Sequence, residues 1–440
     1  MCYTANDIFL LRLKMIAAVI LFVLTYALLL IFPNYRAYIA LVSAIIFVAA
    51  GILPIHKFLF SIDWNVLMMI GGTMGIVSLF IASKMPSLLA DLIIKKMPNV
   101  RWAIISLALF AGLISAFVDN VATVLMVAPV AITICKKLDI SPVKSIITIA
   151  ISSNLQGAAT LVGDTTSILL GGYAGLDFLD FFFFRGKMGM FWVVQISAIA
   201  SALVLAWFFR KDNQKISIDD KTEVKDYFPT VLLVGMIVLL IIASFSPYRL
   251  RIREQDITNG AICVVLYIIG LVREIIKSKK FSAVKSSLME IDFFTLALLG
   301  SLFIVIAGIA EVGVIDKISG FFVKVSKNNL FVIYTILVWA SVLLSAFIDN
   351  IPYAATMLPV VQGIAGIMGI DPIILYFGLL SGATLGGNLT PIGASANITA
   401  LGILRKNGHE VKAWDFMKIS VPFTLAAVSV GYVLIWVVWA

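Results

Sequence analysis

Long hydrophobic runs, separated by short polar segments, dominate the chain. Runs such as Met15–Phe32, Pro229–Phe245 and Trp414–Trp439 approach or exceed the roughly 20 residues that cross a bilayer. We therefore expect an all-α, multi-pass membrane protein. The pattern predicts about ten membrane-spanning helices, near residues 15–32, 36–53, 64–83, 143–172, 189–209, 229–246, 257–272, 292–310, 373–402 and 414–438.

Two further pairs of hydrophobic segments are shorter, and a polar break divides each pair. Residues 102–117 and 121–134 flank the first break at Asp119, and residues 331–347 and 351–366 flank the second at Asp349. Such short arms are typical of a re-entrant hairpin, whose tip lies at membrane depth and is covered by protein or water. The alternative is two full spans that are joined by a tight turn at the surface.

An internal repeat relates the two pairs. The sequence SAFVDN at 115–120 returns as SAFIDN at 345–350, which is 230 residues later. About 15 of the 54 residues from 115 to 168 are identical at this offset, a degree of self-similarity that indicates duplication. Shared hydrophobicity alone would not keep the prolines and glycines in register. The aligned pairs include Pro129 with Pro359, Pro142 with Pro372, Gly157 with Gly387, and Gly163 with Gly393.

The repeat divides the chain into a first transmembrane repeat (1–209), a polar linker (210–228) and a second transmembrane repeat (229–440). Each half has five full spans plus one hairpin. Because five is odd, the second half must be inverted relative to the first, as in many secondary transporters. If both termini lie outside, about 22 of the 33 Lys and Arg residues fall inside, which the positive-inside rule favours.

Composition excludes several classes of function. Apolar residues make up 61% of the chain and charged residues 13%, so a water-soluble globule could not be covered. The net charge of +9 is spread over short loops, which leaves no nucleic-acid-binding domain. Three scattered cysteines and two histidines supply no metal centre or catalytic triad, and no phosphate-binding loop motif occurs. We expect no enzyme activity and no cofactor beyond Na⁺ or H⁺ as a coupling ion.

The predicted chemistry begins at the hairpin tips. A buried Asp in a membrane costs roughly 2.5–3.5 kcal/mol on insertion scales, so Asp119 and Asp349 need an offsetting role. Capping the second arm of each hairpin is one such role, worth about 1 kcal/mol. Asn, Ser or Thr could cap without a charge. The occurrence of Asp at both tips therefore favours ion or proton handling over capping alone.

Glycine- and hydroxyl-rich interruptions follow both hairpins, at Gly157–Ser167 and Gly386–Asn397. A broken helix offers carbonyls to a cation and amide dipoles to an anion. Close helix packing through small residues is the alternative. The predicted ion- or substrate-binding residues come from the tips and the interruptions. They are Asp119, Asn120, Thr160, Asp164, Thr165, Asp349, Asn350, Asn388, Thr390, Ser395 and Asn397.

At these residues the chain resembles the ion transporter superfamily. The likeness is closest to the arsenite efflux permeases, the melanosomal P protein and the NhaD-type sodium/proton antiporters, with citrate-transporter-like permeases as broader relatives. The run GGNLTPIGASAN at 386–397 carries it, with Asp349–Pro352 and Asp119-Asn120. The resemblance implies two hairpins and two broken helices around a midplane site, a scaffold that often dimerises, and elevator-like alternating access. Relatives commonly show Gly-Asp-Pro-Pro-Asn at the first break, whereas this chain has GDTTS at 163–167.

We therefore predict a secondary active transporter of a small ion or polar solute in the cell (inner) membrane, working as a homodimer. The candidates are arsenite or antimonite export, which fits the resemblance, and sodium exchange for protons, which fits the carboxylates equally well. A sodium- or proton-coupled citrate or dicarboxylate permease remains the alternative, and an ion channel is a third. A multivalent carboxylate would meet repulsion from the predicted aspartates, at about 4 kcal/mol per charge pair at 4 Å in an effective dielectric near 20.

Overall fold

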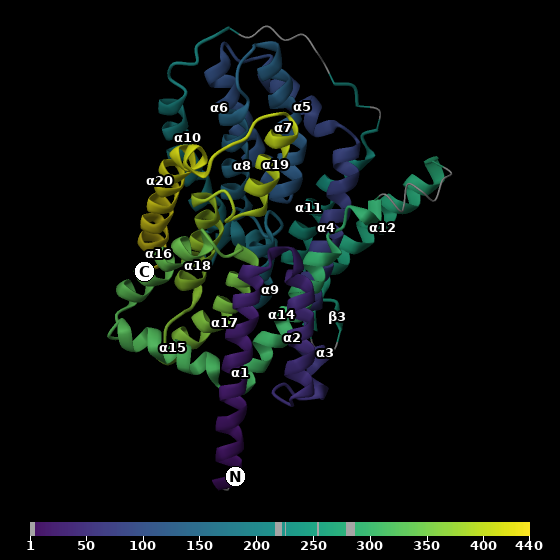
Figure 1. Ribbon diagram of the computed structural model, residues 1–440. Helices are drawn as coiled ribbons and strands as arrows, with labels where there is room; N and C mark the ends of the chain where they lie inside the picture. Colours follow the sequence, from purple (N-terminus) through teal and green to yellow (C-terminus); the bar gives the residue numbers. More distant parts are fainter. Residues whose placement is uncertain (1–4, 216–221, 225, 253–254, 279–286) are drawn as a thin grey trace.

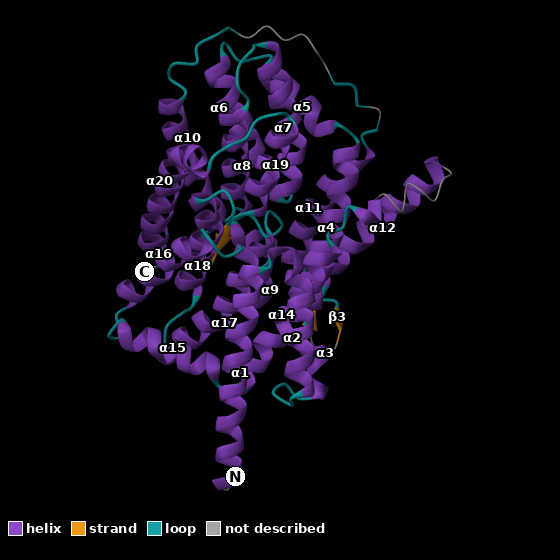
Figure 2. Cartoon of the chain, in the orientation of Figure 1, coloured by secondary structure: helices purple, strands orange, loops and turns teal. Residues whose placement is uncertain are grey.

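The computed structural model describes residues 5–215, 222–224, 226–252, 255–278 and 287–440, and these are almost entirely helical (Figure 2). The described strands form two antiparallel two-residue pairs, β1 (Phe183–Phe184) with β2 (Lys187–Met188) and β3 (Arg251–Ile252) with β4 (Gln255–Asp256). The principal helices up to the linker are α1 (Ala5–Ile31), α2 (Arg36–Ala49), α4 (Trp64–Ala82), α5 (Met85–Ile94), α6 (Val100–Ser115), α7 (Asn120–Lys137), α8 (Val143–Gly157), α9 (Thr165–Ala174) and α10 (Met190–Phe208). Those after it are α11 (Phe228–Phe245), α12 (Thr258–Ser278), α14 (Phe293–Glu311), α15 (Val314–Val325), α16 (Leu330–Ser345), α17 (Asn350–Met368), α18 (Ile373–Gly386), α19 (Ser395–Lys406) and α20 (Ala413–Trp439). Three short elements also position side chains that matter below: α3 (Phe58–Ser61) and the 3₁₀ turns Pro33–Tyr35 and Ile55–Lys57.

The helices confirm a multi-pass membrane protein. Within the described residues, nine helices are long and apolar enough to cross a bilayer, and the pair α15–α16 passes the same test as one bent unit. Large hydrophobic side chains such as Leu203, Val231 and Val437 stay exposed on the outer surfaces of these helices. In water this would be a liability, whereas in a bilayer these side chains face lipid.

Matching capping residues recur in the two halves. The side chains of Asp63, Asn99 and Asp119 accept backbone N–H groups at the starts of α4, α6 and α7. The side chains of Asp292, Asn329 and Asp349 do the same for α14, α16 and α17. Each cap satisfies amides that would otherwise lie unpaired at a helix start. The same local chemistry therefore starts the same three helices twice.

Each predicted hairpin is a helix–turn–helix pair, α6–α7 and α16–α17, and its second arm, α7 or α17, is longer than expected and is one of the nine described helices that could cross a bilayer. Figure 1 shows α5, α6 and α7 at the upper end, and α15 and α17 in the lower part. Backbone bonds from Val100 and Arg101 to residues of the linker place the base of the first hairpin beside the linker. The arrangement agrees with inverted halves, and the division at residues 210–228 stays a prediction.

Helices of the two halves pack against each other in equivalent pairs. α2 packs against α14, and α12 packs against α4. Nearer the middle, α9 packs against α17, and α19 packs against α7 and α8. Each hairpin therefore has the second part of the other half's broken helix as a neighbour. This packing between the halves brings the two tips and the two breaks into one region.

The structure differs from the predicted spans in the N-terminal part. The predicted span 36–53 is only α2, 14 residues long, which is about 21 Å of helix against a hydrocarbon core of about 30 Å. Figure 1 shows the connection between α1 and α2 in the middle of the molecule. The hydrophobic pattern could not show this, because Ile52 and Leu53 are buried without being helical.

The opposed hairpins predict opposite labelling. Lys96 and Lys324 are exposed and lie near the bases of the first and second hairpins. A single cysteine at each position, in a chain whose Cys2, Cys135 and Cys263 are replaced by alanine, should react with a membrane-impermeant thiol reagent from opposite faces. Reaction of both cysteines from the same face would contradict the inverted arrangement.

Candidate functional site

The first helix break is held against the tip of the first hairpin. α8 ends at Gly157, and α9 begins at Thr165. Gly163 approaches the hairpin so closely that a Cβ there would lie 2.8 Å from the carbonyl oxygen of Ala116, so only glycine fits. The hydroxyl of Thr160 donates to the same carbonyl. Because this break lies inside a span, the hairpin tip that contacts it also lies inside the membrane, which supports the re-entrant interpretation.

The second break repeats these contacts. A Cβ at Gly393 would lie 2.8 Å from the carbonyl oxygen of Ala346, and the hydroxyl of Thr390 donates to that carbonyl. The amide of Asn397 donates to the carbonyls of Gly387 at 3.0 Å and Thr390 at 3.1 Å. Thr160, Thr390 and the Asn397 amide therefore bind backbone groups in the structure.

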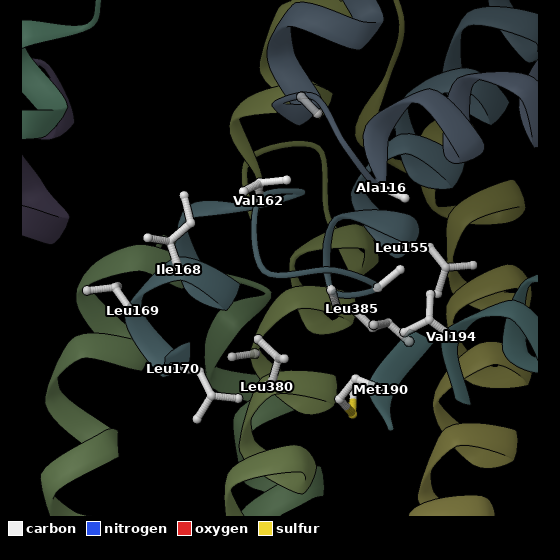
Figure 3. Close-up of a cluster of buried hydrophobic side chains, with 14 of the residues drawn as sticks. Ala116, Leu155, Val162, Ile168, Leu169, Leu170, Met190, Val194, Leu380 and Leu385 are labelled. Carbon is white, nitrogen blue, oxygen red and sulfur yellow. The ribbon is translucent and has the colours of Figure 1, made fainter. Parts of the chain in front are cut away.

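Hydrophobic side chains pack around the first break. Figure 3 shows Val162 on the loop and Ile168, Leu169 and Leu170 on α9. Leu380 and Leu385 of α18, with Met190 and Val194 of α10, complete this buried cluster. A loop packed in this way has few alternative conformations, so the polar groups on its other side are held in fixed positions.

A buried hydrogen-bond network joins the first tip to the second break. Asn120 accepts a bond from the Ser115 hydroxyl at 2.9 Å and donates its amide to Asn154 Oδ1 at 2.9 Å. Asn154 in turn donates to the carbonyl of Thr384 at 2.9 Å and to Asn388 Oδ1 at 3.1 Å. Asn388 is fully buried and donates its own amide to the carbonyl of Ile151 on α8 at 2.9 Å.

A second network joins the second tip to the first break. Asp164 Oδ2 accepts bonds from the Thr166 hydroxyl at 2.9 Å and from the Asn350 amide at 3.3 Å. The Thr166 hydroxyl also lies 2.9 Å from the hydroxyl of Thr384. Asp164 is 5% exposed, so its carboxylate depends on these polar partners. The two networks meet at Thr384 on α18.

A cavity of about 190 Å³, here called the central cavity, opens between these elements. Asp119, Asp164, Glu290 and Asp292 supply its carboxylates, and none of the described residues that line it is Lys or Arg. A second, larger cavity of about 600 Å³, here called the vestibule, shares Ser78, Ile81 and Glu290 with it. The vestibule lies toward the linker end, because linker residues Glu223 and Asp226 help to line it.

An ion-pair group lies at the wall of the vestibule. Asp226 Oδ2 lies 2.7 Å from Arg273 Nη1 and 2.6 Å from Lys277 Nζ. Hydrogen bonds from these cations hold the pKa of Asp226 well below its ordinary value. The carboxylate therefore stays charged at physiological pH and ties the linker to α12.

The structure brings together six of the predicted site residues around the central cavity: Asp119, Asn120, Asp164, Thr165, Asn350 and Ser395. The other five do not line it: Thr160, Asp349, Asn388, Thr390 and Asn397. Thr160 and Thr390 hold the breaks, and Asp349 has an arginine partner that the sequence did not suggest. Arg36 Nη1 lies 2.7 Å from Asp349 Oδ2.

Sequence reasoning also missed four residues of the region. Asn154 and Thr384 occupy equivalent positions at the 230-residue offset, so a closer reading of the repeat could have marked both. Glu290 and Asp292 line the central cavity from the segment before α14. Both side chains are exposed, and the sequence gives no signal that this segment borders a cavity, because Asp292 has the pattern of an ordinary helix cap.

Comparison with known proteins places this architecture in a family. The sequence model described as citrate transporter matches residues 19–382 and 288–440, which together span most of the chain. The chain belongs to the citrate transporter family. This confirms the resemblance to the ion transporter superfamily, and the protein is a secondary transporter of that family's type rather than an enzyme.

Relatives agree with this assignment. An uncharacterized transporter of Mycobacterium tuberculosis strain H37Rv is 28% identical over 431 residues, covering 96% of this chain and 98% of that protein. The human P protein is 25% identical over 447 residues, covering 84% of this chain. The match takes in 53% of the P protein, so the citrate-family chain spans about half of that relative's length.

Solved structures support the fold. The YdaH transporter of Alcanivorax borkumensis has a TM-score of 0.59 at 15% identity, covering 87% of this chain and 86% of that one. Neisseria gonorrhoeae MtrF has a TM-score of 0.56 at 15% identity, covering 88% of this chain and 83% of that one. At this identity the likeness shows a shared fold.

The first network predicts a stability role for Asn154. Asn154→Ala would leave the Asn120 amide and the Asn388 oxygen without this buried partner, at a cost of about 1–3 kcal/mol per unsatisfied group. We expect a clearly lower melting temperature for purified protein in detergent. Asn213→Ala, an exposed linker variant, is the control. Equal melting temperatures for the two variants would contradict the network's role.

Proposed function

We propose that this citrate-family protein is a secondary active transporter that moves a small cation or neutral solute through the central cavity by elevator-like alternating access. Sodium in exchange for protons, or export of arsenite or antimonite, are the candidate activities. The observation that carries the proposal is the acidic lining: four carboxylates and no described Lys or Arg. We further propose a homodimer in the cell (inner) membrane.

The acidic lining of the central cavity disfavours anionic substrates. Two like charges 4 Å apart repel by about 4 kcal/mol in an effective dielectric near 20. A free multivalent carboxylate would meet this repulsion from Asp119 and Asp164, whereas sodium, a proton or an uncharged hydroxide would not. Asp349, predicted at this site, bonds Arg36 instead of lining the cavity. The lining is still acidic, because Glu290 and Asp292 also line the cavity.

Asp164 is the residue best placed to exchange a proton for a cation. Its carboxylate is buried in the first break, and the described groups that bond it are neutral, namely Thr166 and Asn350. A buried carboxylate with neutral partners is stabilised when a proton or a cation joins it. Asp119 lines the same cavity as Asp164, so a charge bound at one of these carboxylates affects the other.

One observation favours the alternative, a cation-coupled carboxylate permease. α9 and α19 begin at the central cavity, at Thr165 and Ser395, and neither start has a side-chain cap. Helix starts carry partial positive charge and attract anions. The name of the matching family points the same way. In this version the carboxylate enters together with cations that neutralise the lining, and an ion channel remains the third reading.

The carboxylates should carry the coupling. In proteoliposomes with imposed sodium or proton gradients, Asp164→Asn and Asp119→Asn should lose most cation-coupled flux, because each removes a charge and keeps the side-chain shape. Asp415→Asn, at an exposed ion pair with Lys418, is the matched control. Radiolabelled sodium, arsenite and citrate are measured in parallel.

Full coupled flux in both cavity variants would mean that neither aspartate carries the coupling, and it would leave Asp119 with its role as the cap of α7 only. Strong citrate uptake that depends on sodium, with no sodium/proton or arsenite activity in the unmodified protein, would replace the leading proposal by the alternative.

Substrate affinity should depend on Ser395 and not on Asn397. Ser395 lines the central cavity, so Ser395→Ala should raise KM severalfold with little change in melting temperature. Asn397→Ala removes bonds to two backbone carbonyls and should lower the melting temperature instead. Gly71→Ala is the control, since a Cβ there meets only Leu296 at 3.5 Å. A raised KM in Gly71→Ala alone would contradict this assignment.

A further inference from the structure

The tip of the second hairpin is tied to the N-terminal helices. Arg36, at the start of α2, lies 2.7 Å from Asp349, and the two side chains are 19% and 14% exposed. Tyr26 of α1 donates its hydroxyl to the carbonyl of Pro352 at 2.9 Å and also bonds the hydroxyl of Thr356. The C-terminal part of α1 and the start of α2 therefore hold the first turns of α17 and the tip.

The first tip has a different environment. Asp119 caps α7 through the amides of Val121 and Ala122 and lines the central cavity. No ion pair to Asp119 occurs among the described residues. The vestibule continues from this cavity toward the linker end. The structure is thus open toward the linker beside the first tip, and the second tip is closed onto α1 and α2.

Among the described residues, this ion pair occurs at the second tip and has no equivalent at the first. α2 packs against α14 as α12 packs against α4, so the start of α12 is the counterpart of the start of α2. α12 begins Thr258-Asn259-Gly260, and no described residue of α12 forms an ion pair with Asp119 as Arg36 of α2 does with Asp349. An ion pair that exists in only one of two alternating states favours that state.

We propose that Arg36 is a gating residue: its ion pair with Asp349 closes the site on the face away from the linker, and transport requires this pair to break. The inference rests on the alternating access of the proposed function, and it names the residue that favours the state open toward the linker face. When the second hairpin leaves α1 and α2, Arg36 and Asp349 separate and both become exposed to the opposite aqueous phase.

The pair is strong enough to matter and weak enough to break. Partly buried, charge-assisted bonds exceed ordinary hydrogen bonds in strength, and removing one partner leaves the other charge poorly solvated. A shift of tenfold in the ratio of the two states corresponds to about 1.4 kcal/mol. Neutralising Arg36 should therefore shift the population toward the state that is open on the opposite face.

The test measures accessibility rather than transport. Ser395→Cys, in a chain without Cys2, Cys135 and Cys263, reports on the central cavity. Its reaction with an impermeant thiol reagent is measured from each face of oriented vesicles. With Arg36 present, we expect reaction mainly from the linker face. With Arg36→Gln, the rate from the opposite face should rise about tenfold or more, following the population argument above.

Rescue separates gating from a merely structural role. Arg36→Lys keeps a cation and should restore the linker-face preference in part. Asp349→Asn keeps an oxygen that can cap α17 and removes the charge, so it should raise the rate from the opposite face as Arg36→Gln does. Lys57→Gln removes an exposed ion pair between the turn before α3 and Glu311 of α14, and it should change nothing.

Two results would overturn the proposal: an unchanged face preference in folded Arg36→Gln, or the same change in Lys57→Gln. If Arg36→Gln does not fold, Asp349→Asn decides, since a folded Asp349→Asn with an unchanged face preference also overturns the proposal. The measurement needs no substrate. If cation transport is not observed but the accessibility still depends on Arg36, the proposed substrate is wrong and the proposed gating role of Arg36 stands.

Discussion

Backbone groups freed by a helix break inside a membrane have no water to bond, and they must find partners within the protein. In this chain both breaks are placed against a hairpin tip, where a glycine allows close approach and a threonine hydroxyl bonds a tip carbonyl. Thr160 with Ala116 and Thr390 with Ala346 are the two copies of this contact. The positions of Asp164 and Ser395 at the central cavity follow from it, because the contact fixes where α9 and α19 begin.

The two copies then carry different chemistry on the same frame. Asp164 lies in the first break, and Ala394 occupies the equivalent position in the second, so only one break holds a carboxylate. Asp119 faces the cavity, whereas its counterpart Asp349 bonds Arg36. The duplicated scaffold thus carries a carboxylate in one break only, and the aspartates at its two tips have different partners. This difference is what a directional transport cycle needs from an otherwise repeated fold.

The sequence predicted most of the frame, because duplication keeps Asp, Pro and Gly in register and hydrophobic runs keep their lengths. Both hairpins, both breaks and the acidic character of the region could be foreseen in this way. What could not be foreseen are contacts between distant segments: Arg36 with Asp349, Glu290 and Asp292 at the cavity, and Asn154 between tip and break. Hydropathy records whether a residue is polar, and it does not record which polar partner the fold brings to it.

The central claim is that buried carboxylates at the central cavity exchange protons for a cation. Addition of sodium to purified protein in weakly buffered detergent tests it most directly, with proton release followed by a pH-sensitive dye. The account predicts saturable proton release from the unmodified protein and its loss in Asp164→Asn, because a cation and a proton compete for the same carboxylate. Proton release of equal size in Asp164→Asn, or none from the unmodified protein, would contradict it.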